Sequence, residues 1–140
     1  MKILIAVDGS PFTKRMLAYL TAHDEFPGRG HDYTVLTAVP PVPPRAAAVV
    51  DKATLDGYYG DEAEKVFKPI RSFLSRQGID AKFQYKVGHA GETISSIADK
   101  GKFDLLVMGS HGHGTLTNLV MGSVATKVLA HTKVPVLLVR

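Results

Sequence analysis

The sequence predicts an α/β fold: an open, five-stranded parallel sheet with helices on both faces, similar to Rossmann-like folds. Short apolar runs typical of strands alternate along the chain with segments whose apolar residues recur at helical spacing. Parallel neighbouring strands need crossover connections, which these helices supply. The chain has 140 residues, 45% hydrophobic and 21% charged, so we expect residues 1–140 to form a single globular domain.

The first half of the chain predicts two strands joined by a helix. The first strand is expected at residues 2–7. A helix follows with Ser10 as its cap and Pro11 at its first position, an arrangement that helices favour. The second strand is expected at 33–39. The proline-rich run 40–44 can neither donate to a sheet nor continue a helix, and we expect a loop there. The apolar face of the first helix should comprise Phe12, Met16, Leu17 and Leu20.

The next pair of elements is a long helix and an edge strand. The helix should run from the fifties to Gln77 and stop at Gly78, with a kink or a fresh start at Pro69. Its inward residues should be Val66, Ile70, Phe73 and Leu74. The strand at 81–87 alternates apolar residues with lysine and glutamine, a pattern typical of an edge strand with one solvated face.

The last part of the chain repeats the alternation of helix and strand. A helix is expected at about 92–100, a buried strand at 103–108, a helix at 124–131 and an apolar strand at 134–139. In open parallel sheets ligands bind outside the carboxyl ends of the strands, where the strand order reverses. The order 3-2-1-4-5 would place Asp8, after the first strand, and Gly109, after the fourth, at one such crevice.

A glycine-rich loop follows the fourth strand and includes Gly109, Gly112, Gly114 and Gly122. Glycines let the backbone approach a ligand closely. A helix opening at Gly122 and Ser123 offers unpaired N–H groups, the positive end of its dipole and a hydroxyl at the cap, which together favour a phosphate. The alternative is a flexible loop that ends in an ordinary serine cap. The loop is neither a Walker loop nor a dinucleotide fingerprint, because it lacks the spacing of both.

Asp8 is the second candidate site residue. Its carboxylate could accept hydrogen bonds from ribose hydroxyls or hold a divalent cation attached to phosphates. Its alternative role is local, because Asp-Gly-Ser-Pro is good turn chemistry and the carboxylate could bond the nearby backbone. His111 and His113 flank Gly112 and could bind phosphate or face solvent. A metal site ranks last for them, because no third ligand lies nearby in sequence.

The glycine pattern resembles the nucleotide-binding signature of the universal stress protein family: Gly-x-x-Gly, nine residues, then Gly-Ser, matched by Gly109, Gly112, Gly122 and Ser123. The first and last strands resemble those of the same family. The resemblance implies the strand order 3-2-1-4-5 and a site for ATP, ADP or AMP, with any magnesium or manganese carried by the nucleotide. Family members commonly have arginine where this chain has His113, and neutral histidine supplies less positive charge to a triphosphate.

The resemblance also implies a role for each matched residue. Asp8 would lie near ribose and adenine, and Ala38 or Val39 would offer backbone groups to adenine. Met108 and Gly109 would line the ribose. The phosphates would contact Gly112, Gly122, Ser123 and Val124. A homodimer through the strand at 134–139 is also implied, and the apolar, lysine-free character of that strand supports it if it lies at the sheet edge.

Composition excludes several function classes. The net charge is +4, but the basic residues are scattered, so we expect no nucleic-acid partner. No segment has the ~20 apolar residues of a membrane helix, and the first apolar run is too short for a signal peptide, so we expect a cytoplasmic protein without a membrane partner. The function expected is nucleotide-dependent regulation or interaction in a stress response. The alternatives are a slow ATPase or phosphotransferase in the same crevice, and an interaction module with a vestigial pocket.

Overall fold

The computed structural model describes residues 1–23, 30–113 and 121–140, so Gly114 of the glycine loop lies outside the described residues. Five parallel strands form one sheet in the order β3-β2-β1-β4-β5, which confirms the predicted order. The strands are β1 (Lys2–Ala6), β2 (Asp32–Val39), β3 (Ala81–Val87), β4 (Leu105–Gly109) and β5 (Val136–Val139). The predicted edge position of the strand at 81–87 is therefore also confirmed.

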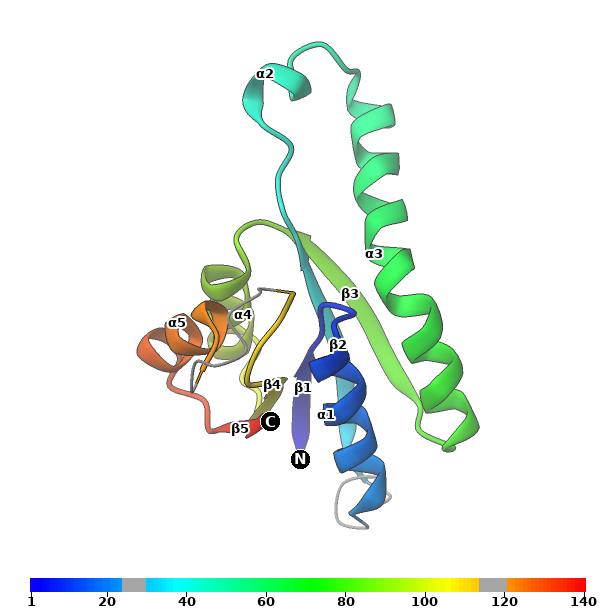
Figure 1. Ribbon diagram of the computed structural model, residues 1–140, viewed down its shortest axis with the longest axis vertical. Helices are drawn as coiled ribbons and strands as arrows, with labels where there is room; N and C mark the ends of the chain where they lie inside the picture. The colour runs from blue at the N-terminus through cyan, green and yellow to red at the C-terminus, as the bar shows by residue number, and fades with distance from the viewer. Residues whose placement is uncertain (24–29, 114–120) are drawn as a thin grey trace.

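Helices cover both faces of this sheet (Figure 1). They are α1 (Pro11–Ala22), α2 (Pro44–Ala47), α3 (Lys52–Arg76), α4 (Ala90–Lys100) and α5 (Ser123–His131). Helices α1 and α3 pack on one face, and α4 and α5 pack on the other, so each face has its own hydrophobic cluster. The first half of α3, together with α2, extends beyond the carboxyl ends of the strands (Figure 1).

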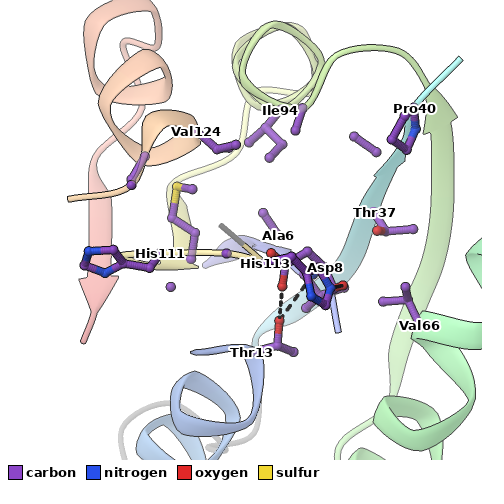
Figure 2. A pocket seen from close by; sticks show the side chains of 18 of the residues that line it. Ala6, Asp8, Thr13, Thr37, Pro40, Val66, Ile94, His111, His113 and Val124 are labelled. Atoms are coloured by element: carbon purple, nitrogen blue, oxygen red, sulfur yellow. Dashed lines mark hydrogen bonds between the residues drawn. The ribbon is translucent and has the colours of Figure 1, made fainter. Parts of the chain in front are cut away.

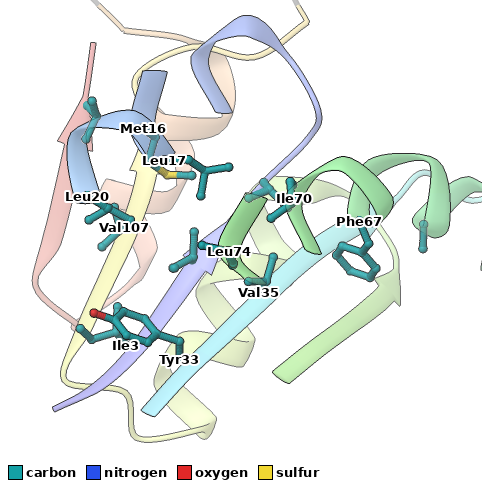
Figure 3. Close-up of a cluster of buried hydrophobic side chains, with 14 of the residues drawn as sticks. Ile3, Met16, Leu17, Leu20, Tyr33, Val35, Phe67, Ile70, Leu74 and Val107 are labelled. Atoms are coloured by element: carbon teal, nitrogen blue, oxygen red, sulfur yellow. The ribbon is translucent and has the colours of Figure 1, made fainter. Parts of the chain in front are cut away.

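The central strand β1 supplies both clusters because successive side chains of a strand point to opposite faces. Ile3 and Ile5 pack with α1 and α3 (Figure 3), whereas Leu4 packs with α4 and α5. All three are at most 1% exposed. Burying each side chain of this size stabilises the fold by about 1.5–3 kcal/mol. This rigid double-sided core fixes where the carboxyl ends of the strands lie.

The structure overturns one local expectation and refines two others. Pro69 lies inside α3, which runs from Lys52 to Arg76, so of the two outcomes expected at this proline the fresh start is excluded. Its exposed position, with the Ile70 side chain held in the core, lets the packing of the helix compensate for the lost hydrogen bond. Pro44 begins the short helix α2, because proline suits the first helical position even where it cannot continue a helix. Phe12 is only half-buried, and its ring contacts that of His111 at 4.9 Å between centroids.

Candidate functional site

A pocket of about 670 Å³ lies at the carboxyl ends of β1, β2 and β4, where the strand order reverses (Figure 2). Every site residue named from the sequence lines it, and these residues come from four separate segments of the chain. They are Asp8, Ala38, Val39, Met108, Gly109, Gly112, Gly122, Ser123 and Val124. The fold therefore places all the candidates around one cavity.

Asp8 is held in place by the turn between β1 and α1. Its Oδ1 accepts hydrogen bonds from the Ser10 N–H and the Thr13 hydroxyl, both at 2.9 Å. The other oxygen, Oδ2, lies 2.5 Å from the position that a Cβ would take at residue 112. One carboxylate oxygen thus builds the turn while the other faces the glycine loop. The local role and the pocket-lining position, which the sequence offered as alternatives, are both present in one side chain.

The N-terminus of α5 provides the hydrogen-bond donors of the pocket. The cap of this helix is Gly122, and Ser123 is the first helical residue, so the expected serine cap was wrong by one position. The Gly122 N–H already donates to the Ser110 carbonyl at 2.7 Å. The first intrahelical bond runs from the Thr126 N–H to the Gly122 carbonyl, which leaves the N–H groups of Ser123, Val124 and Ala125 without an intrahelical acceptor. All three residues line the pocket.

The end of β2 offers backbone groups on the opposite side of the pocket. The last hydrogen bond between β1 and β2 joins the Val7 N–H to the Leu36 carbonyl. Because backbone groups alternate sides along a strand, those of Ala38 also point toward β1, beyond the point where pairing ends. The Val39 carbonyl points the other way and accepts from the Gly88 N–H. Ala38 is therefore the better placed of the two to bind the edge of a planar base.

Several pocket residues were not found from the sequence. Thr37 of β2 is 3% exposed, points into the cavity (Figure 2), and makes no hydrogen bond through its hydroxyl with another of the described residues. The signal available was a polar residue at an inward position of a buried strand. Two residues of α3, Glu62 and Val66, also line the pocket, as does Ile94 of α4. Their contribution depends on how the helices pack and left no motif in the sequence.

The two loop histidines are both engaged within the protein. His113 Nε2 lies 2.6 Å from the Asp8 carbonyl oxygen, which links the glycine loop to the end of β1. His111 Nδ1 lies 2.8 Å from the Ser110 hydroxyl. Within residues 1–23, 30–113 and 121–140, no group of three or more histidine, aspartate or glutamate side chains could hold a metal ion. In the same ranges no helix is long and apolar enough to cross a membrane.

Comparison with known proteins gives one consistent family. A sequence profile described as the universal stress protein family matches residues 1–140. A universal stress protein from Thermus aquaticus is 35% identical over 138 residues, 99% of this chain and 97% of the relative. Universal stress protein Slr1230 from Synechocystis is 31% identical over 139 residues, 99% of this chain but 42% of the relative. The chain therefore spans less than half of that second protein.

Solved structures agree with this result. The structure of MJ0577 from Methanocaldococcus jannaschii superposes with a TM-score of 0.79 at 28% identity, over 99% of this chain and 94% of that one. An Archaeoglobus fulgidus universal stress protein in complex with dAMP gives 0.70 at 20% identity, over 100% and 98%. An Arabidopsis thaliana family member with AMP bound gives 0.69 at 14% identity, over 99% and 90%. At these lower identities the likeness demonstrates the fold.

Proposed function

This chain belongs to the universal stress protein family, and on that premise we propose that it binds an adenine nucleotide in the pocket at the carboxyl ends of β1, β2 and β4. One observation carries the proposal: residues from four distant segments converge on one cavity that has helix N–H donors at one side and free strand backbone at the other. The AMP and dAMP complexes of structural relatives give independent support.

The nucleotide lies across the pocket in this proposal. The phosphate accepts hydrogen bonds from the N–H groups of Ser123 and Val124 and from the Ser123 hydroxyl, at the positive end of the α5 dipole. Met108 and Gly109 line the ribose, and Asp8 Oδ2 faces it from the end of β1. The adenine edge pairs with the backbone of Ala38, as adenine presents one donor and one acceptor side by side. Val39, Gly112 and Gly122 shape the walls.

We further propose that nucleotide occupancy regulates a partner interaction in a stress response, and that any magnesium or manganese arrives with the nucleotide. The cytoplasmic location and the single-domain organisation expected from the sequence remain predictions.

Pairing of two chains through β5 belongs to the same proposal. The fold places β5 at the sheet edge. The Pro135 carbonyl accepts from the Leu106 N–H and the Val139 carbonyl accepts from the Ser110 N–H, so both face β4. Because backbone groups alternate sides along a strand, those of Val136 and Leu138 face outward.

Calorimetric titration with AMP, ADP, ATP and GMP tests nucleotide binding, and two variants of Ser123 test its location. Ser123→Pro removes the N–H, and proline is favoured at a first helical position that follows an extended residue such as Gly122. Ser123→Ala keeps the N–H and is the matched control. We expect Ser123→Pro to lose about tenfold or more in affinity, as for a charge-assisted bond, and Ser123→Ala to lose less. An unmodified chain that binds none of the four nucleotides would refute the proposal.

A further inference from the structure

The pocket has an unusual charge distribution for a nucleotide site. Among its described lining residues there are two carboxylates, Asp8 and Glu62, and no lysine or arginine. The sequence from Gly109 to Ser123 also contains no lysine or arginine, so the glycine loop has no such cation to contribute. The described lining also holds two histidines, His111 and His113. The site would therefore bind phosphate without the lysine or arginine side chains that normally neutralise a triphosphate.

Three basic side chains, one each from α3, α1 and α5, make contacts with other residues of the protein. Lys65 Nζ forms an ion pair with Glu62 at 2.8 Å on the exposed surface of α3, and this pair offsets the negative charge of that carboxylate. The Arg15 guanidinium lies over the Phe12 ring at 5.0 Å. Lys127 of α5 pairs with Glu92 of α4 at 2.8 Å. His113, which belongs to the glycine loop, has its Nε2 at 2.6 Å from the Asp8 carbonyl oxygen.

The donors that remain suit a single phosphate. A helix N-terminus is equivalent to roughly half a positive charge, and the Gly122 N–H of this one is already used by Ser110. A terminal phosphate carries about −1.5 to −2 at neutral pH, and every phosphate added to it brings further negative charge toward Asp8 Oδ2 and Gly112. Because no lysine or arginine of the described lining neutralises the additional phosphates, repulsion and desolvation should lower their binding affinity.

We propose that this pocket selects nucleoside monophosphates over the corresponding triphosphates. The inference rests on the proposed nucleotide function and names its ligand class: a nucleotide with one phosphate, presented as a monoester or a cyclic diester. The chain would then respond to the products of nucleotide consumption or of cyclisation, in contrast to a protein that is saturated by triphosphate.

The test is a calorimetric series of adenosine, AMP, ADP and ATP, first with a chelator and then with magnesium. We expect AMP to bind about tenfold tighter than metal-free ATP, because the extra negative charges of the triphosphate would lie near the Asp8 carboxylate in a lining without lysine or arginine. Magnesium should reduce the difference in affinity between AMP and ATP. ATP binding as tightly as AMP in chelator would overturn the selectivity and leave the nucleotide function intact, whereas no binding by any member would overturn the function itself.

Charge variants separate selectivity from folding. Glu62→Gln removes a lining carboxylate and should raise ATP affinity relative to AMP by about threefold. Asp56→Asn makes the same charge change on the exposed surface of α3, outside the pocket, and is the matched control. His113→Arg adds a cation beside the loop and should shift the ratio toward ATP further. If the AMP-to-ATP ratio is unchanged in Glu62→Gln and His113→Arg, the lining charge does not set the preference.

Discussion

At the scale of single residues, the glycines of the pocket are required by the protein before any ligand arrives. A Cβ at Gly112 would lie 2.5 Å from Asp8 Oδ2, and a Cβ at Gly109 would lie 2.9 Å from the Phe12 Cβ. A Cβ at Gly122 would lie 3.1 Å from the His111 Cα and 3.2 Å from the Ser110 carbonyl oxygen. The glycine pattern therefore reflects how closely the loop approaches the turn after β1, the start of α1 and the start of α5.

Substitution of Gly122 should move the loop and thereby weaken nucleotide binding. Gly122→Ala requires a shift of a few tenths of an ångström, and Gly122→Val a larger one, at a cost of about 1–3 kcal/mol in stability for such overpacking. Calorimetry should record reduced AMP affinity in the alanine variant and none measurable in the valine variant, with an unchanged far-ultraviolet spectrum. Gly57→Ala, where no atom lies within 4 Å, is the control and should bind normally. Unaltered affinity in Gly122→Val would place the phosphate elsewhere.

The Thr37 hydroxyl should contact the ligand. Thr37 is 3% exposed as a residue, it lines the pocket, and its hydroxyl makes no hydrogen bond with another described residue, so the hydroxyl is available to a ligand in the pocket. Thr37→Val keeps the shape of the side chain and should lower AMP affinity about 3- to 10-fold, the value of one hydrogen bond, while thermal stability stays the same or rises. Thr37→Ser retains the hydroxyl and should bind nearly as the unmodified chain does. Equal binding by the valine variant would show that the hydroxyl makes no ligand contact.

Residue-level prediction named the residues of a local motif that line the pocket and missed those that only packing brings there. The spacing of Gly109, Gly112, Gly122 and Ser123 located the loop because close backbone approach restricts those positions. Thr37 and Glu62 gave no comparable signal, since only the crossing of β2 and α3 brings them to one cavity. The cap of α5 was misplaced by one residue because glycine and serine are both acceptable caps.

At the scale of elements, the alternation of strands and helices predicted the parallel sheet, and the resemblance to the universal stress protein family supplied its strand order. The ends were less certain: the last strand begins at Val136 and not at Val134, and the long helix passes through Pro69. Both differences arise because tertiary packing, and not local propensity, decides where pairing and helix stop. Val66, which was expected inward on α3, packs against the core and also lines the pocket.

Asp99 connects two elements and should make stability depend on pH. Its Oδ1 accepts from the Thr132 hydroxyl at 2.7 Å and the Lys133 N–H at 3.0 Å, and these bonds hold the pKa of the carboxyl below its usual value. A lowered pKa in the folded state stabilises the fold above the unfolded value, about 3.9, and this contribution disappears as pH falls through the folded value.

Thermal unfolding of Asp99→Ala should therefore give a lower Tm than the unmodified chain at pH 7, and the gap should close as pH falls below about 4. Asp56→Ala, on the exposed surface of α3, controls for the loss of a carboxylate and should show no such dependence. A gap for Asp99→Ala that persists unchanged at low pH would assign the effect to the lost side chain and not to its charge.

At the scale of the whole molecule, the proposed dimer depends on the open edge of β5. Leu138→Pro removes an outward N–H without disturbing the bonds to β4, because the backbone of residue 138 faces away from that strand. Leu138→Ala loses the same side-chain packing but keeps the N–H. In sedimentation we expect a dimer for the unmodified chain and for Leu138→Ala, and a monomer for Leu138→Pro. A monomeric unmodified chain would exclude the dimer, and a dimeric proline variant would place its interface elsewhere.

The central claim is that one pocket joins the α5 N-terminus to the end of β2 around an adenine nucleotide. Titration of the isotopically labelled chain with AMP, followed through backbone amide NMR signals, tests it most directly. The account predicts saturable shifts concentrated at Ser123 and Val124, for the phosphate, and at Ala38, for the base. No shifts at nucleotide concentrations up to about 1 mM, or shifts confined to residues outside the pocket, would contradict it.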